Sequence, residues 1–151
     1  MRQMAAPSGR PPRSGQAAKG RNKTAPPPRP VPVVRPRSYA AIDLGTNNCR
    51  LLIARPQEGE LVVIDAFSRI VRLGEGLAAS SRLADAAMDR AVEALKICRG
   101  KMANRGVTRA RLVATEACRA ATNGLDFIRR VAAEAELALE VIDQRTEAAL
   151  A

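Results

Sequence analysis

The sequence predicts an α/β fold built on a mixed β-sheet, and two patterns along the chain support this prediction. Three strand-like segments follow one another through short turns between residues 39 and 72. Beyond them, amphipathic helical segments alternate with short apolar runs as far as residue 147. Short turns join antiparallel strands whereas helical crossovers join parallel ones, so the sheet should contain both kinds of pairing.

Composition separates a basic tail from the rest of the chain. Residues 1–38 hold nine of the 25 Lys and Arg residues and no acidic residue, and nine of the ten prolines lie within residues 1–36. This segment also contains few large apolar side chains, and their burial cannot offset the entropy that is lost when such a segment becomes ordered. We therefore expect residues 1–37 to be a disordered Pro-rich tail, and residues 38–151 to form one domain whose 16 basic and 15 acidic residues nearly balance.

The composition also excludes several classes of protein and site. No apolar stretch is long enough to cross a membrane or to serve as a secretory signal, so we expect a cytoplasmic protein. Cys49, Cys98 and Cys118 are too far apart for a CxxC pair and are expected to be reduced and buried. Because the chain has no histidine, it lacks Ser-His and Cys-His nucleophile pairs and the usual zinc sites.

Strand patterns predict the first three elements. Residues 39–44, 49–55 and 60–72 are rich in apolar and β-branched side chains, and Glu58 and Gly59 are placed to form the second turn. These strands should form an antiparallel meander.

Helical periodicity then takes over. From about Arg82, apolar residues recur every three or four positions up to Met102, which predicts a long helix. Residues 110–114 suit a buried strand, and residues 115–122 and 125–135 suit a helix that is interrupted near Gly124. A last strand is expected at 139–142, followed by a helix that begins at Glu147 with Thr146 as its N-cap. The resulting order, βββαβαβ, is that of the ribonuclease H-like half-domain of the actin-like ATPase and sugar kinase superfamily.

The motif DLGTNN at residues 43–48 points to phosphate chemistry. Gly45 would allow a positive φ or a close approach of the backbone to a ligand, and the amides that follow can form an anion-binding concavity. Thr46, Asn47 and Asn48 add side-chain donors, and Asp43 would hold Mg²⁺ or orient water. An ordinary hairpin turn explains the same residues equally well.

Two later segments each place a charged residue after a strand. Arg119 lies one turn into the helix of ATEACRAATN at 114–123, where its planar guanidinium could bind phosphate. Glu147 in IDQRTEAAL at 142–150 could act as a general base towards water. Taken singly, a solvated surface arginine and a favourable first-turn acid explain these residues better than a catalytic site does.

Together the three segments resemble the exopolyphosphatase and guanosine pentaphosphate phosphohydrolase (Ppx/GppA phosphatase) family, from about Tyr39 to Ala151. YAAIDLGTNNCRLLIA is similar to the family's first strand, phosphate loop and second strand, and VRLGEGL at 71–77 is similar to its loop after the third strand. The resemblance implies that residues 45–48 form the phosphate loop, that Arg119 binds phosphate and that Glu147 is the catalytic glutamate. It also implies release of terminal phosphate from polyphosphate or guanosine pentaphosphate with Mg²⁺.

The sequence departs from the family pattern in two places. Ala149 stands where an arginine often follows the family's glutamate, and no second glycine-rich phosphate loop is found. The resemblance therefore implies an amino-terminal half, inactive by itself, of an enzyme that can be a homodimer at full length. Two alternatives stay open: a sugar or carboxylate kinase or actin-like ATPase half-domain, and a non-catalytic module that holds an anion while its basic tail contacts polyanions.

Overall fold

A computed structural model of the protein describes residues 37–150. The tail predicted at residues 1–37 lies outside the described residues, apart from Arg37. Within the described part, the strands are β1 (Ser38–Leu44), β2 (Asn48–Gln57), β3 (Glu60–Ile70), β4 (Val107–Ala114) and β5 (Glu140–Val141). The helices are α1 (Leu77–Ser80), α2 (Asp85–Asn104), α3 (Glu116–Ala120), α4 (Gly124–Ala135) and α5 (Gln144–Leu150).

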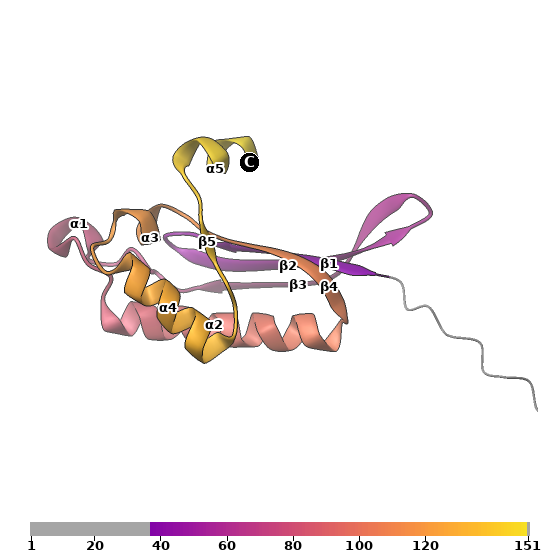
Figure 1. The fold of residues 1–151 in the computed structure, drawn as a ribbon, viewed down its shortest axis with the longest axis horizontal. Helices are drawn as coiled ribbons and strands as arrows, with labels where there is room; N and C mark the ends of the chain where they lie inside the picture. Colours follow the sequence, from indigo (N-terminus) through magenta and orange to yellow (C-terminus); the bar gives the residue numbers. More distant parts are fainter. Residues whose placement is uncertain (1–36, 151) are drawn as a thin grey trace, which may run out of the picture. The chain divides into compact units, whose positions relative to one another are not determined.

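The strands form one mixed sheet in the order β3-β2-β1-β4-β5 (Figure 1). The β1–β2 and β2–β3 pairs are antiparallel, whereas β4 runs parallel to both β1 and β5. The helical crossover through α2 brings β4 alongside β1, and the crossover through α3 and α4 brings β5 alongside β4, each in the same direction as its neighbour. The predicted order and the ribonuclease H-like fold class are confirmed.

Two helices cover one face of this sheet and create the hydrophobic core. Alternate residues of β1 and β2 point to α2 and α4, while their neighbours in sequence are exposed on the opposite, open face. Helix α5 lies over the open face, on the other side of the sheet from α2 and α4 (Figure 1). The largest fully buried side chains of the core include Phe127, Ile42, Leu44, Leu51, Ile53, Leu95, Val92 and Val131.

The predicted turn at Glu58 and Gly59 is confirmed. Both residues have positive φ, 51° and 89°, which is the requirement of the two-residue type I′ turn that matches the twist of a hairpin. The turn joins β2 and β3 with Gln57 paired to Glu60.

The helix boundaries differ from the prediction in two places. Helix α2 begins at Asp85 rather than near Arg82, because a short helix, α1, and a bend precede it. Helix α5 begins at Gln144, so Thr146 lies inside it and the predicted Thr146 cap is wrong. The side chain of Asp143 caps the helix instead, accepting a hydrogen bond of 2.7 Å from the backbone N–H of Thr146.

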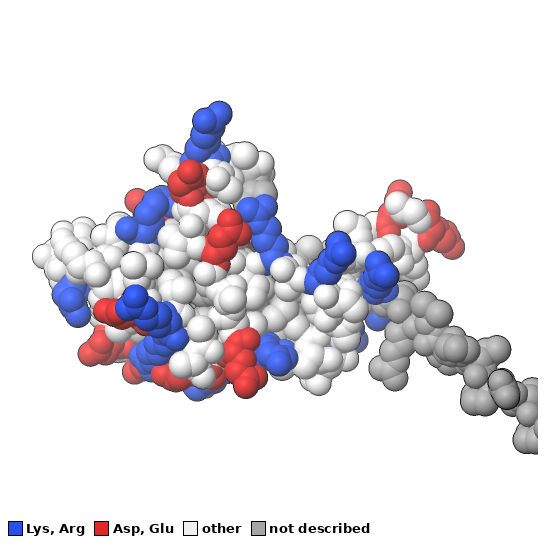
Figure 2. All heavy atoms as spheres, in the orientation of Figure 1, with Lys and Arg blue, Asp and Glu red and all other residues white. Residues whose placement is uncertain are grey.

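The surface over α2 and α4 is a mixture of both charges (Figure 2). Ion pairs link neighbouring residues there, for example Lys96 with Glu93 and Arg130 with both Asp89 and Glu134. Such exposed pairs contribute little to stability individually. Among residues 37–150, no helix has the length and apolar character required to span a membrane.

A less exposed ion cluster predicts how stability depends on pH. The carboxylate of Asp65 on β3 lies 2.9 Å from both Lys101 Nζ and Arg105 Nε near the end of α2. Hydrogen bonds from Lys101 and then Arg105 lower the pKa of Asp65 to about 2. Because the folded pKa is below the unfolded value of about 3.9, the stabilisation is complete above that value and disappears as pH falls towards 2.

We therefore expect Asp65→Asn to destabilise the protein at pH 6 but to have a shrinking effect as pH falls from about 5 to 2. Urea unfolding of both proteins across this range measures the difference. A constant difference in the free energy of unfolding would contradict the role of the ionised carboxylate.

Candidate phosphate site

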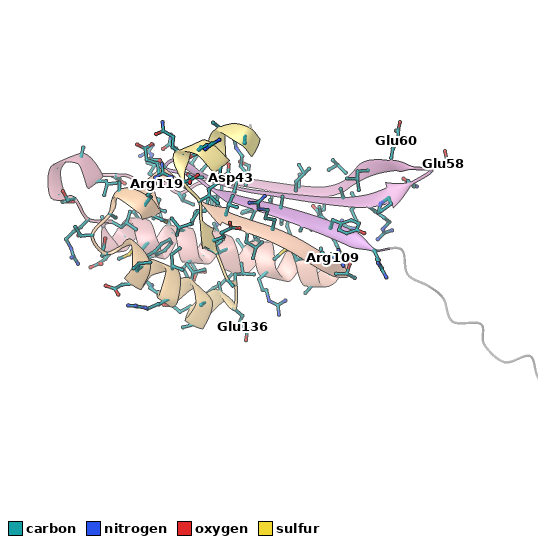
Figure 3. The ribbon with its side chains drawn as sticks, turned by 45° about the horizontal axis from the view of Figure 1, so that its top comes forward. Asp43, Glu58, Glu60, Arg109, Arg119 and Glu136 are labelled. Carbon is teal, nitrogen blue, oxygen red and sulfur yellow. The ribbon has the colours of Figure 1, made fainter. Side chains whose placement is uncertain are left out.

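The site lies at the carboxyl ends of β1, β4 and β5, where α5 covers the open face. A cavity of about 460 Å³ opens there. Asp43 from β1 and Glu147 from α5 both line it, together with Thr115, the first residue after β4. Figure 3 shows Asp43 and Arg119 at the same end of the sheet, near α5. Segments that are about 100 residues apart in sequence thus meet at the edge where α/β sheets bind ligands.

The turn of residues 45–48, which we call the phosphate loop, joins β1 to β2. The N–H of Gly45 donates to the carbonyl oxygen of Asn48 at 2.9 Å and closes the turn. Among the residues that the structure describes, the backbone N–H groups of Thr46 and Asn47 have no hydrogen-bond partner. Both residues are exposed, so these two amides are available to an anion from solvent.

Gly45 itself does not adopt a positive φ, so the first of its two predicted roles is wrong. Thr46 and Asn47 form the turn without a positive φ at either residue. A Cβ at position 45 would lie 3.6 Å from the Asn48 carbonyl oxygen and 3.9 Å from Thr115 Oγ1. These are ordinary contact distances, and Gly45 is not among the residues that line the cavity, so a close approach of a ligand to its backbone stays a prediction.

Arg119 joins the helix α3 to the segment that carries Glu147. Its Nη1 donates a hydrogen bond of 2.6 Å to the carbonyl oxygen of Ile142, just after β5. The same nitrogen lies 3.7 Å from Glu147 Oε2. Because a guanidinium has five donors, these two contacts leave others free for a ligand.

Glu147 is held at the start of α5 by the backbone as well as by Arg119. Its N–H donates to the carbonyl oxygen of Asp143 at 2.9 Å. The backbone N–H of Thr146, followed by its hydroxyl, lowers the pKa of Asp143, which stays ionised as the cap of this helix. The Glu147 side chain remains 41% exposed, so it can reach water in the cavity.

The carboxylates of the site suit a hard cation held jointly with a substrate. In residues 37–150, no group of three or more His, Cys, Asp or Glu residues could hold a metal ion. Asp43 and Glu147 nevertheless contribute two carboxylates to one cavity. Mg²⁺ is commonly bound by one or two carboxylates together with water and substrate phosphates, and the donors present fit that pattern.

The cysteines are confirmed as free and buried, and they take no part in the site. Cys118 is the residue before Arg119, but burial raises its pKa to about 12. A neutral thiol is a poor nucleophile, so Cys118 is not suited to act as one.

Comparison with known proteins identifies the family. Residues 52–151, about two thirds of the chain, match the model of the Ppx/GppA phosphatase family. The protein belongs to the Ppx/GppA phosphatase family. The predicted resemblance to this family is thereby confirmed.

Solved Ppx/GppA structures share the fold. The chain is 34% identical to a family member from Aquifex aeolicus, with a TM-score of 0.71 over 74% of this chain and 36% of that one. It is 31% identical to an exopolyphosphatase from Cytophaga hutchinsonii, with a TM-score of 0.72 over 76% of this chain and 36% of that one. The chain thus spans about a third of the length of the solved Ppx/GppA proteins that it matches.

Three polar residues that line the cavity were not predicted as site residues from the sequence. Thr115 is 5% exposed and its hydroxyl donates to the Leu44 carbonyl oxygen at 3.4 Å. Arg50 and Arg111 line the cavity from the open face of β2 and β4. The position of Thr115 at the end of a predicted strand was a usable signal, whereas the two arginines looked like ordinary exposed positions of alternating strands.

Proposed function

We propose that this domain binds the terminal phosphate of a phosphoanhydride chain and supplies the general base for its hydrolysis. The substrate would be polyphosphate or guanosine pentaphosphate, the substrates of the enzymes that the sequence resembles. The observation that carries the proposal is the position of Glu147, which is 3.7 Å from Arg119 and shares a cavity with Asp43, two residues before the phosphate loop.

Each group has one chemical role in this proposal. The amides of Thr46 and Asn47 and the guanidinium of Arg119 would bind the phosphate oxygens. Glu147 would accept a proton from the water that attacks phosphorus. Asp43 would help to hold Mg²⁺, which neutralises charge on the phosphates when it is bound.

The test is the release of inorganic phosphate by a version of this protein as long as its solved relatives. We expect release from the ends of polyphosphate or from guanosine pentaphosphate in the presence of Mg²⁺. If phosphate appears instead on a hydroxyl acceptor after incubation with ATP, the protein is a kinase and the proposal is wrong.

Arg119 should contribute strongly to the affinity of the site. We expect Arg119→Gln to raise the Kd for tripolyphosphate by roughly tenfold or more, because a hydrogen bond to a charged group contributes about 1.5–3 kcal/mol. Arg119→Lys keeps the charge but loses the planar guanidinium, so its Kd should lie between those of the native protein and Arg119→Gln. Isothermal titration calorimetry measures all three.

Arg129 on α4 offers a matched control for this loss of charge. Its side chain is 76% exposed and pairs with Asp126 on the same helix. If Arg129→Gln weakens binding as much as Arg119→Gln does, the affinity depends on net charge and not on this site.

A further inference from the structure

The loop after β3 is bonded directly to the backbone of the phosphate loop. The N–H groups of Val71 and Arg72 donate to the Asn47 carbonyl oxygen at 2.9 and 3.0 Å. The N–H of Gly74 donates to the Thr46 carbonyl oxygen at 2.9 Å. We call residues 71–76 the support loop.

These bonds fix the direction of an amide that the proposed function uses. In a planar trans peptide, the C=O and N–H of one unit point in opposite directions. The Thr46 carbonyl and the Asn47 N–H belong to the same peptide unit. Because that carbonyl points to Gly74, the Asn47 N–H points away from the support loop.

The support loop is itself held firmly. Val71 and Leu73 are fully buried in the core. Arg90 of α2 donates from Nε to the Val71 carbonyl oxygen at 2.9 Å and pairs with Glu75 at 2.7 Å. Because both its side chains and its backbone are held, this loop has little freedom to move away from a neighbouring side chain.

Gly74 is the point of closest approach between the two loops. A Cβ at position 74 would overlap Cγ2 of Thr46 and lie 3.6 Å from its Cβ and 3.7 Å from its carbonyl oxygen. Gly74 does not have the positive φ that favours glycine. The glycine is therefore required by the space that the Thr46 methyl group occupies.

The conflict would be with one methyl group of a stiff side chain. Threonine is branched at Cβ, so its methyl and hydroxyl groups rotate together about χ1. A side chain at position 74 would force that rotation and move the Thr46 hydroxyl away from its present place. Serine lacks the methyl group and could keep its hydroxyl where it is.

We propose that Gly74 is a positioning residue of the phosphate site, which sets the χ1 rotamer of Thr46 and so the place of its hydroxyl within the phosphate loop. This inference rests on the proposed function. The side-chain conformation of the phosphate loop would then depend on the space left by a glycine of the support loop, about 30 residues later in the sequence.

The experiment measures the effect of Gly74→Ala in two backgrounds of the full 151-residue chain. In the native background, we expect Gly74→Ala to change the χ1-dependent NMR couplings of Thr46 and to raise the Kd for tripolyphosphate roughly tenfold. In the Thr46→Ser background, the same substitution should raise the Kd less than about twofold, because the methyl group that it meets is gone.

The possible outcomes are distinct. Equal losses of tripolyphosphate affinity in the two backgrounds would overturn the inference, and so would unchanged Thr46 couplings in Gly74→Ala. A native chain that binds no tripolyphosphate would contradict the proposed function instead, and the couplings of Thr46 would still decide whether Gly74 sets its rotamer.

Discussion

Replacing Glu147 with glutamine should lower kcat for phosphate release by about 10²- to 10⁴-fold in a version of the protein as long as its solved relatives. Glutamine has nearly the same shape but cannot accept a proton from water. The ion pair with Arg119 is long, at 3.7 Å, and Glu147 is 41% exposed. Such a pair contributes little, so KM should change far less than kcat.

Glu136 provides the control for this substitution. It lies just after α4, far from Asp43 and Arg119 (Figure 3), and its side chain is 76% exposed. We expect Glu136→Gln to leave phosphate release unchanged. Equal turnover of Glu147→Gln and the native enzyme would remove Glu147 from the proposed mechanism.

Gly124→Ala should be the most destabilising single substitution that we predict, by about 3 kcal/mol. A Cβ at position 124 would overlap the carbonyl oxygen of Cys118 and lie 3.0 Å from its carbonyl carbon. These are backbone atoms of α3, which cannot rotate away as a side chain does. Urea unfolding followed by circular dichroism measures the loss.

The same substitution should also weaken the phosphate site. Cys118 directly precedes Arg119, so a displacement of α3 moves the guanidinium away from Ile142 and Glu147. Gly100→Ala in α2 is the matched control, since a Cβ there meets nothing within 4 Å. The control should be neutral or stabilising by up to about 1 kcal/mol. If Gly124→Ala is also neutral or stabilising, the close packing of Gly124 against α3 is contradicted.

The strand and helix order was predictable because hydrophobic periodicity reflects burial on one face of the sheet. Alternation in β1 and β2 and the three-and-four spacing of α2 match the buried residues of the core. Arg119 and Glu147 were predictable as a pair only through the family resemblance, because neither residue differs in sequence from an ordinary surface charge.

Other features depended on contacts that a single sequence does not encode locally. The Thr146 cap was wrong because Asp143, three residues earlier, is an equally good cap and lies nearer the end of β5. The role of Gly74 was invisible because it depends on the Thr46 side chain of a different loop. The cavity residues Arg50 and Arg111 became apparent only when the sheet register placed them on the same face.

The proposed phosphate site is tested most directly by an NMR titration of the 151-residue chain with tripolyphosphate in the presence of Mg²⁺. We predict that the amide signals of Thr46 and Asn47 and the Nε signal of Arg119 shift together with a single Kd. Shifts confined to the basic residues of the segment 1–37, with these three signals unchanged, would contradict a phosphate site formed by the phosphate loop and Arg119.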